Sequence, residues 1–224
     1  SWSPRNFTAV MEALPFLTFF KNTFLMVLFR VLGSVFFSAM AAYAFARLEF
    51  PGRNLLFGLV LLQMMVPGQI FILPQYMIVN KLGWLNTIQA LALPGIVSTF
   101  GTFLLRQFFM SLPKDLEEAA VLDGCSVWKI FWKIMLPLTK PGLVSVAIFT
   151  ALFAWKDLMW PLIVNMSIEK MTLSSGLVNL MGQYSVDYPQ LMAGSLIAIV
   201  PMIILFLVFQ KQFVEGIATS GTKG

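Results

Sequence analysis

The stretch DLEEAAVLDGCSVWKIFWKIMLPL, residues 115–138, is a polar interruption in a hydrophobic chain. Four of the ten acidic residues fall within nine positions of it, from Asp115 to Asp123, and an aromatic segment with two lysines follows. Of the 224 residues, only 11% are charged and 58% are hydrophobic, with a mean hydropathy of +0.83. Soluble domains carry about 25% charged residues. The composition therefore predicts an all-α polytopic membrane protein in which this stretch forms a loop outside the bilayer.

Several classes of function are disfavoured by the residue types present. The net charge of +5 comes from basic residues scattered between apolar runs, which do not form the stripe of a nucleic-acid binder. The chain has no histidine and one cysteine, Cys125, so we expect no metal site, no haem and no internal disulfide. A membrane enzyme would need a nucleophile, a metal cluster or paired carboxylates at one depth, and we expect no catalytic residue.

Five stretches are apolar and long enough to cross a bilayer, which takes about 20 helical residues. The expected spans are at about 23–46, 55–73, 86–109, 141–164 and 190–210. Pro67 and Pro74 interrupt the second apolar run, and proline disrupts the hydrogen-bond ladder of a helix. We expect this run to turn near Pro67 or Ile70 and to continue as a short surface helix.

Lysine and arginine residues in the short flanks set the orientation, because cytoplasmic loops are enriched in positive charge. Nine lie on the side of the 47–53 loop, the 106–140 segment and the C-terminus, and four on the other side. The C-terminus is therefore expected in the cytoplasm and the N-terminus outside. A chain that begins outside suggests a further upstream helix and six spans in the full-length protein. The alternative is a genuine five-span protein.

The loop at 113–140 is too long for a simple turn and has a pattern of its own. Residues 115–122 are helix formers with acids near the positive end of the helix dipole. Gly124 suits the left-handed conformation that ends many helices. We expect this first short helix to expose Ala119 and Ala120. Small side chains let another backbone approach closely, so this surface is suited to docking a separate cytoplasmic protein.

A second short helix follows in the same loop, with Ser126 as a candidate N-cap. Val127, Phe131 and Ile134 would line one of its faces, with tryptophans and lysines beside them. Such a helix is typical of the membrane interface, where tryptophans lie at headgroup depth and lysines reach the phosphates.

The spacing within this loop resembles the signature EAA-x3-G-x9-I-x-LP of the membrane permease subunits of bacterial ABC importers. Seven fixed positions match: Glu118, Ala119, Ala120, Gly124, Ile134, Leu136 and Pro137. The likeness extends over nearly the whole chain and looks closest to maltose-type carbohydrate permeases, for example in AAYAFARLEFPGR (41–53) and FAWKDLMWPLIV (153–164). It implies a single type I importer transmembrane domain over residues 1–224.

In that family the EAA helix is the coupling helix, which seats in a cleft of an ATP-hydrolysing subunit. The resemblance implies that Glu118, Ala119, Ala120 and Gly124 make this contact. How much the neighbouring Glu117 and Asp123 add to it is left open. Ile134, Leu136 and Pro137 would hold the second helix against the membrane.

The resemblance also implies the partners of this chain. They are a second permease subunit, two ATP-binding cassette ATPase subunits, an extracytoplasmic substrate-binding protein and the lipid of a bacterial inner membrane. ATP and magnesium would be bound by the ATPases, with no cofactor in this chain. Gly216 and Gly221 have the spacing of a phosphate loop, but Thr222 and Lys223 reverse its order and no helix follows. The outer segment 165–189 would meet the binding protein, or it would be a plain connector.

The expected substrate is a sugar. Glycerol phosphate or another small polar solute is the alternative within the same class of importer. A rival class is the ion-driven secondary transporter, which usually shows inverted repeats with matched broken helices. The patterned loop occurs once in this chain and has no counterpart in the other half.

Arg30, Lys156 and Asp157 lie deep inside predicted spans, where charges are costly and usually face protein or water. Lys156 and Asp157 are adjacent on a helix and point about 100° apart, so each needs another partner. One hypothesis is a structural ion pair between Arg30 and Asp157. The other places Trp155, Lys156 and Asp157 along the sugar pathway, with hydroxyls bound by polar groups and a ring stacked on the indole. Gln63 and Gln75 are weaker pathway candidates, since a lone amide in a span more often bonds a neighbouring helix.

Overall fold

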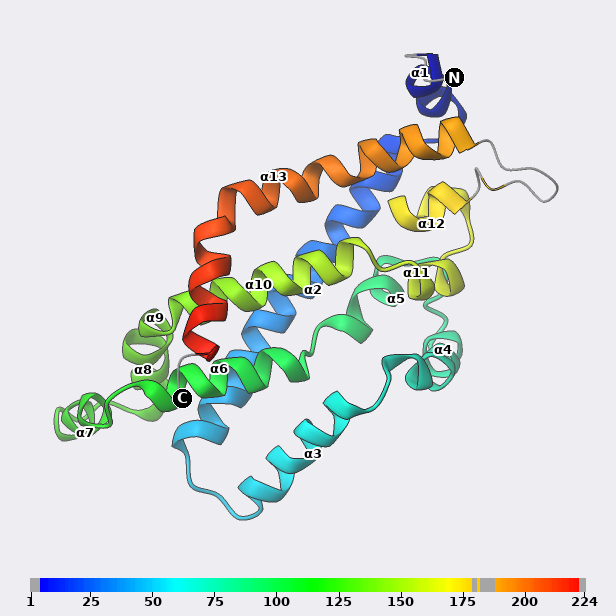
Figure 1. The fold of residues 1–224 in the computed structure, drawn as a ribbon. Helices are drawn as coiled ribbons and strands as arrows, with labels where there is room; N and C mark the ends of the chain where they lie inside the picture. The colour runs from blue at the N-terminus through cyan, green and yellow to red at the C-terminus, as the bar shows by residue number, and fades with distance from the viewer. Residues whose placement is uncertain (1–4, 179–180, 182–187, 222–224) are drawn as a thin grey trace. The chain divides into compact units, whose positions relative to one another are not determined.

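In a computed structural model, residues 5–178, 181 and 188–221 are described, with side chains as far as Lys211. Apart from Met181, which forms an isolated bridge, the secondary-structure elements in these ranges are helices (Figure 1). The α-helices are α1 (Arg5–Ala13), α2 (Phe16–Arg47), α3 (Arg53–Met65), α4 (Ile72–Lys81), α5 (Ile88–Ala92), α6 (Thr99–Ser111), α7 (Asp115–Leu122), α8 (Val127–Ile130), α9 (Leu136–Leu138), α10 (Lys140–Trp155), α11 (Met159–Val164), α12 (Leu173–Leu177) and α13 (Tyr188–Gly221). Four short elements join them: η1 (Gly68–Phe71), η2 (Leu93–Gly95), η3 (Phe131–Met135), which is π-helical, and η4 (Ile168–Lys170).

Two helices are long and apolar enough to cross a bilayer unaided. They are α2 and the Tyr188–Lys211 segment of α13. Three further spans arise if each bent pair of helices counts as one: α3 with η1–α4, α5–η2 with α6, and α8–α9 with α10. The part of the chain that the structure describes therefore holds two to five candidate spans, and the five predicted boundaries stay predictions.

The second apolar run bends where its first proline predicts. α3 ends at Met65, and the next helical element, η1, begins at Gly68. Val66 has φ −87° and ψ 125°, the extended conformation that a proline imposes on the residue before it. The predicted turn at Pro67 is confirmed.

Residues 141–164, predicted as one span, do not form one helix. α10 ends at Trp155 and α11 begins at Met159. Pro161 lacks an amide N–H, and in a continuous helix its ring would clash with the carbonyl four residues earlier, that of Asp157. A break at residues 156–158 avoids this clash and lets the Asp157 side chain turn toward other elements.

The chain divides into two compact units. Unit 1 comprises Ser1–Arg30, Gly68–Gly95 and Thr150–Phe209. Unit 2 comprises Val31–Pro67, Ile96–Phe149 and Gln210–Gly224. Helices α2, α10 and α13 contribute residues to both. The single domain expected over residues 1–224 stays a prediction.

The core of unit 1 forms around Phe19, whose side chain is fully buried. Gly176 of α12 approaches it so closely that an added Cβ would lie 2.2 Å from the ring. Thr23, also fully buried, donates its hydroxyl to Phe19 O and accepts a hydrogen bond from Leu173 N, each at 2.8 Å. These contacts fix α12 against the first turns of α2.

The core of unit 2 contains three aromatic rings from distant parts of the chain. Tyr43 lies 5.5 Å from Phe109 and 5.2 Å from Phe131, measured between ring centroids. Tilted and edge-on pairs at such distances are favourable geometries for aromatic side chains. They join α2 to α6 and η3, and Figure 1 shows α7, α8 and α9 grouped at one end of α6. The polar loop is thus packed on the core of unit 2.

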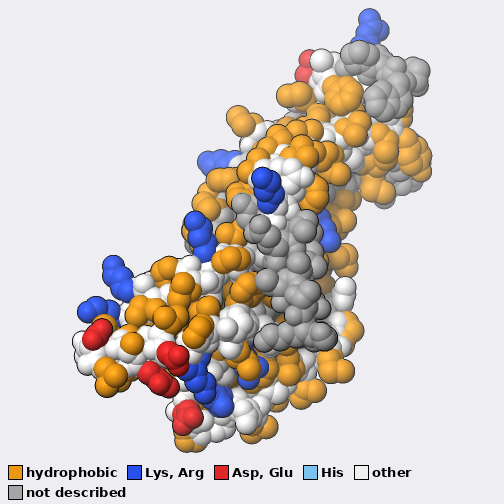
Figure 2. All heavy atoms as spheres, turned by 60° about the vertical axis from the view of Figure 1, so that its left-hand side comes forward, with side chains coloured by type: hydrophobic (Ala, Val, Ile, Leu, Met, Phe, Trp, Pro, Cys, Tyr) orange, Lys and Arg blue, Asp and Glu red, His pale blue; other side chains and the backbone are white. Residues whose placement is uncertain are grey.

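Much of the surface is apolar. Hydrophobic side chains cover much of the face shown in Figure 2, while charged side chains gather toward its lower end. Leu17, Leu55 and Met65 are 86%, 71% and 80% exposed. Soluble monomers rarely expose large contiguous apolar patches, whereas in lipid an outward leucine needs no protein cover.

Candidate functional site

The helix α7 exposes most, but not all, of its predicted docking surface. Glu118, Ala119 and Asp123 are exposed, as is Gly124 beyond the end of the helix. Leu122 is 88% exposed. The exposed end of α7 thus combines two acidic side chains, Glu118 and Asp123, with an apolar one.

Ala120 does not belong to this exposed surface, so the prediction that both alanines face outward is wrong for it. Its side chain is 5% exposed and joins the core cluster of unit 2 that contains Phe109 and Phe131. Adjacent residues of an α-helix point about 100° apart, so Ala119 can face solvent while Ala120 packs inward. A small side chain at 120 lets α7 lie close to the core.

The turn between the two loop helices has the conformation that the sequence predicts. Gly124 has φ +75°, which glycine adopts without steric cost. Its N–H donates to Val121 O, and Cys125 N donates to Ala120 O, each at 2.9 Å. This pair of bonds is the Schellman arrangement at a helix end. Ser126 then caps the next helix by accepting from Lys129 N at 3.4 Å.

The second loop helix buries only part of its predicted face: Phe131 is buried and Ile134 packs against the core cluster, but Val127 does not. Ile130, Phe131 and Met135 are buried, whereas Val127 is 49% exposed. The segment η3 is π-helical, with bonds from i to i+5. This winding brings Ile130 and Met135 to the same side and displaces the i, i+4, i+7 stripe expected of a regular α-helix.

The remaining motif positions lie in or just after η3. Ile134 and Leu136 are partly buried and pack against the unit 2 core cluster, while Pro137 is exposed. Trp128 and Trp132 are 60% and 45% exposed. The protein core therefore holds Ile134 and Leu136, and the tryptophans are the outward aromatic groups.

Glu117 points inward, unlike its neighbour Glu118. Tyr43 donates its hydroxyl to Glu117 Oε1 at 3.0 Å, and Arg47 Nε lies 3.2 Å from Glu117 Oε2. The second contact is an ion pair without hydrogen-bond alignment. Arg47 Nη2 also donates to Phe109 O at 2.6 Å and to Leu112 O at 2.5 Å. One carboxylate of α7 is therefore tied to the last turns of α2 and, through Arg47, to the C-terminal end of α6.

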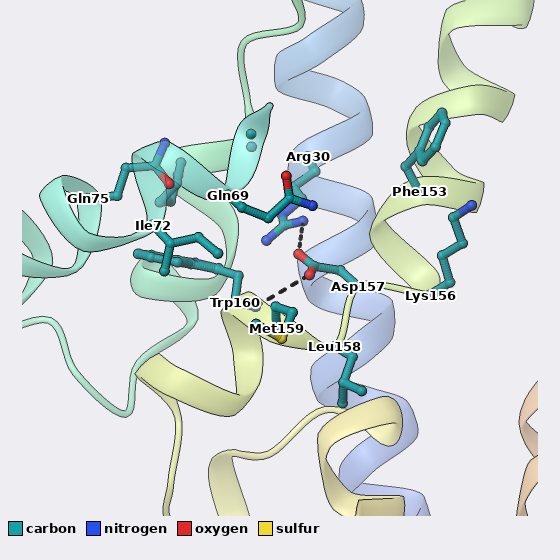
Figure 3. Close-up of a pocket in the computed structure, with 13 residues that line it drawn as sticks. Arg30, Gln69, Ile72, Gln75, Phe153, Lys156, Asp157, Leu158, Met159 and Trp160 are labelled. Atoms are coloured by element: carbon teal, nitrogen blue, oxygen red, sulfur yellow. Dashed lines mark hydrogen bonds and ion pairs between the residues drawn. The ribbon is translucent and has the colours of Figure 1, made fainter. Parts of the chain in front are cut away.

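A polar pocket of about 500 Å³ lies in unit 1 (Figure 3). Its walls come from α2, η1, α4, η2, α10, the 156–158 break and α11. The lining includes Arg30, Lys156 and Asp157 together with the amides Gln69 and Gln75. Concave sites that combine apolar walls with a few convergent polar groups are the usual form of a small-molecule site.

Arg30 is the most highly connected side chain of this pocket. Its Nη1 lies 2.8 Å from Asp157 Oδ2, and its Nε and Nη2 donate to Leu91 O at 2.9 and 2.7 Å. Gly95 leaves room for the guanidinium, since a Cβ there would lie 2.7 Å from Arg30 Cδ. Asp157 Oδ1 in turn accepts from Trp160 N at 3.5 Å. The structure thus brings together the two residues predicted as an ion pair, and Asp157 also meets the start of α11.

The other predicted pathway residues are placed differently. The Lys156 side chain points away from the ion pair and its Nζ lies 4.6 Å from the Phe153 ring centroid (Figure 3). Trp155 donates its indole N–H to Ala198 O at 3.0 Å and, with Lys156, lines a second pocket of about 410 Å³. Gln63 is an exposed residue of α3, in unit 2. Neither Trp155 nor Gln63 lines the pocket of Arg30 and Asp157.

Gln69 and Trp160 line this pocket and were not singled out from the sequence. Gln69 lies just after the bend at Pro67, and Figure 3 shows its side chain reaching toward Arg30. Trp160 is 6% exposed and donates its indole N–H to Ala90 O at 2.8 Å. The bend itself was the available signal for Gln69, because backbone that leaves the helical course can point polar groups into a cavity. Nothing in the local sequence distinguishes Trp160 from an interfacial tryptophan.

Among the described residues, no group of three or more His, Cys, Asp or Glu side chains could hold a metal ion. The polar groups of the pocket are an ion pair, a lysine and amides. Such groups can bind hydroxyl, carboxylate or phosphate oxygens by hydrogen bonds and charge.

Comparison with known proteins gives the wider context of these two sites. The family described as "Binding-protein-dependent transport system inner membrane component" matches residues 34–218. The chain is 42% identical over 213 residues to the arabinooligosaccharides transport system permease protein AraQ of Halalkalibacterium halodurans, which covers 95% of this chain and 76% of that protein. It is 32% identical over 212 residues to the sn-glycerol-3-phosphate transport system permease protein UgpE of Salmonella typhi, covering 94% and 75%.

A solved structure is similar in fold as well. A chain of a bacterial ABC transporter involved in the import of the acidic polysaccharide alginate superposes with a TM-score of 0.81 at 25% identity. The match covers 93% of this chain and 79% of the other. The helical arrangement is therefore that of an ABC importer transmembrane domain.

Proposed function

The chain belongs to the family of binding-protein-dependent transport system inner membrane components, and from this premise we propose that it is the permease subunit of an ATP-driven sugar importer. It is a transport subunit, as its relatives are. In the proposed assembly it pairs with a second permease in a bacterial inner membrane. Two ATPase subunits bind ATP and magnesium on the cytoplasmic side, where the C-terminus also lies, and a substrate-binding protein docks outside.

The exposed end of α7 carries this proposal. Glu118 and Ala119 project from the helix beside Leu122, while Ala120 anchors the same helix to the core. A surface that combines acidic and apolar side chains offers both charge and buried area to a partner. We infer that this surface seats in the ATPase, with Gly124 and Asp123 at its edge. Closure of the ATPases on ATP would then move α7 and switch the permeases between inward-open and outward-open states.

The pocket of Arg30 and Asp157 is our candidate for part of the translocation pathway. Its lysine and amides can bond hydroxyls as a sugar passes, and the ion pair shapes its wall. Lys156 lines this pocket and also the second one, whereas Trp155 lines the second pocket alone. Gln63, on α3, would contribute only if the pathway continues along that helix.

Two substrate classes have support from relatives. The identity to an arabinooligosaccharide permease favours a saccharide. The second candidate is a small phosphorylated solute. It is favoured by the identity to a glycerol-phosphate permease and by a pocket lined by two basic side chains and one acidic side chain. A tagged chain purified from its native membrane would bring its binding protein with it. Thermal stabilisation of that protein by arabinotriose, and its indifference to sn-glycerol 3-phosphate, is the expected result.

The docking surface is tested with the same purified assembly. Leu122→Asp should abolish co-purification of the ATPase, because a charge would replace the exposed apolar side chain. Leu138→Asp is the matched control, since Leu138 is 48% exposed in α9 of the same loop, and it should leave co-purification intact. Full ATPase recovery with Leu122→Asp would refute the proposed contact.

A further inference from the structure

Glu117 lies one residue before the proposed ATPase contact but faces the opposite way. Its side chain is 17% exposed, and that of its partner Arg47 is 6% exposed. Glu118, next to it, is exposed. Two adjacent acids of one short helix thus have different surroundings, one open to a partner and one held inside unit 2.

The inward acid is held by two groups from the same helix. Tyr43 and Arg47 are four residues apart on α2, so their side chains emerge on one face. Tyr43 is 6% exposed and packs its ring against Phe109 and Phe131, which leaves its hydroxyl fixed where it meets Glu117. The carboxylate is therefore bound through both oxygens by side chains that cannot readily move apart.

Arg47 joins this carboxylate to a third element. Its Nη2 donates to the carbonyls of Phe109 and Leu112, at the C-terminal end of α6. The last carbonyls of a helix lack intrahelical donors and attract cations. The guanidinium thus binds two carbonyls at the end of α6 and also pairs with Glu117 of α7. α7 therefore cannot shift relative to α2 and α6 without breaking charged contacts.

We propose that Glu117, Arg47 and Tyr43 form the linkage that transmits movement of α7 to the span α2, and that Glu117 is a positioning residue and not an ATPase contact. The inference rests on the proposed function, because it requires α7 to be the element that the ATPase moves. Without the linkage α7 still presents Glu118, Ala119 and Leu122. It then tilts on the core when pushed, and the force does not reach α2.

Substitutions at Glu117 separate transmission from docking. Glu117→Gln keeps the size of the side chain and an oxygen for the Tyr43 hydroxyl, but it loses the ion pair with Arg47. Asp115→Asn is the matched control: it removes the same charge from the same helix, at an exposed position in its first turn. Tyr43→Phe removes only the hydroxyl and should give a weaker form of the same defect.

The readout is the coupling ratio of the assembled importer in proteoliposomes, that is, arabinotriose taken up per ATP hydrolysed. With Glu117→Gln we expect the ATPase to co-purify in normal amount and the ratio to fall about fivefold or more, the range typical of a lost coupling between sites. Asp115→Asn should keep the wild-type ratio. In a double-mutant cycle, Arg47→Gln with Glu117→Gln should lose no more than Arg47→Gln alone, because the two act as a pair.

Other outcomes overturn the inference in distinguishable ways. A wild-type ratio with Glu117→Gln, or strictly additive losses in the cycle, means that the linkage does not transmit force. Loss of ATPase co-purification with Glu117→Gln means that Glu117 is a docking residue after all. Neither result touches the proposed docking of α7 on the ATPase, which fails if Leu122→Asp leaves co-purification intact. If arabinotriose is not a substrate, the wild type and the variants are compared by their rates of ATP hydrolysis with and without the binding protein.

Discussion

Arg30 and Asp157 are 127 positions apart in the sequence, yet Arg30 Nη1 lies 2.8 Å from Asp157 Oδ2 in the wall of a pocket. The arginine comes from the middle of the long helix α2 and the aspartate from the break that Pro161 imposes between α10 and α11. Charged side chains within a membrane span are costly unless they are paired, and this contact pairs the two.

Loss of one partner of this pair should be strongly destabilising. Asp157→Asn leaves the Arg30 guanidinium, 10% exposed, without a counter-charge, and breaking a buried pair in this way costs about 3–5 kcal/mol. Thermal unfolding of the purified chain in detergent measures the loss. Lys156→Gln is the control: its side chain is exposed, so the change should stay within about 0.5 kcal/mol. Equal stability of the two variants would contradict the structural role of the pair.

Thr23 should be sensitive to the loss of its hydroxyl alone. Thr23→Val keeps the shape but leaves the buried Leu173 N–H without its acceptor at 2.8 Å, which costs about 1–3 kcal/mol. Thr23→Ser keeps the hydroxyl and should be less affected. Unfolding midpoints of the two variants make the comparison. A valine variant at least as stable as the serine variant would show that this bond does not hold α12.

Gly176 and Gly58 should respond in opposite ways to alanine. Gly176→Ala places a methyl group 2.2 Å from the buried Phe19 ring, and such overpacking typically costs about 1–3 kcal/mol. Gly58 lies within α3 and has no atom within 4 Å of an added Cβ. Gly58→Ala should therefore be neutral or stabilising by up to about 1 kcal/mol, as alanine favours helix. Thermal unfolding of both variants decides the matter, and a neutral Gly176→Ala would mean that Phe19 moves aside freely.

Substitutions at Gly124 should separate the effect of backbone strain from the effect of a bulky side chain on ATPase docking. An added Cβ has nothing within 4 Å, but φ is +75°, so Gly124→Ala should cost about 1–2 kcal/mol of stability. Gly124→Asn should cost less, because asparagine tolerates this conformation. Gly124→Trp should insert in the membrane yet abolish transport-linked ATP turnover, since its ring would fill the proposed docking surface. Undiminished turnover in the tryptophan variant would place Gly124 outside the ATPase contact.

Local rules predicted the local features well. The bend at Pro67, the left-handed Gly124 and the cap of Ser126 depend on one or two side chains and their own backbone, so residue identity is enough. The ion pair of Arg30 with Asp157 was also within reach, because an unpaired charge in a span demands a partner and few are available.

The failures have a common physical cause, which is that they depend on neighbours distant in sequence. Ala120 is buried because α7 packs against the aromatic core of unit 2, and its own sequence does not show which alanine faces that core. The buried face of the second loop helix follows from its π-helical winding. Trp155 packs against Phe20 and bonds to Ala198, both distant in the sequence, and these contacts set it in the wall of the second pocket.

The sequence by itself determined that this is a helical membrane protein, that residues 115–138 form two short helices with a glycine turn, and that their spacing resembles a coupling motif. Hydrophobicity, proline geometry and glycine conformation are properties of each residue, and they act before any tertiary contact forms. Only the tertiary structure decided that Glu118 faces outward while Glu117 binds Tyr43 and Arg47. The direction of a side chain on an amphipathic helix is fixed by what the helix packs against, and the free energy of that packing comes from residues elsewhere in the chain.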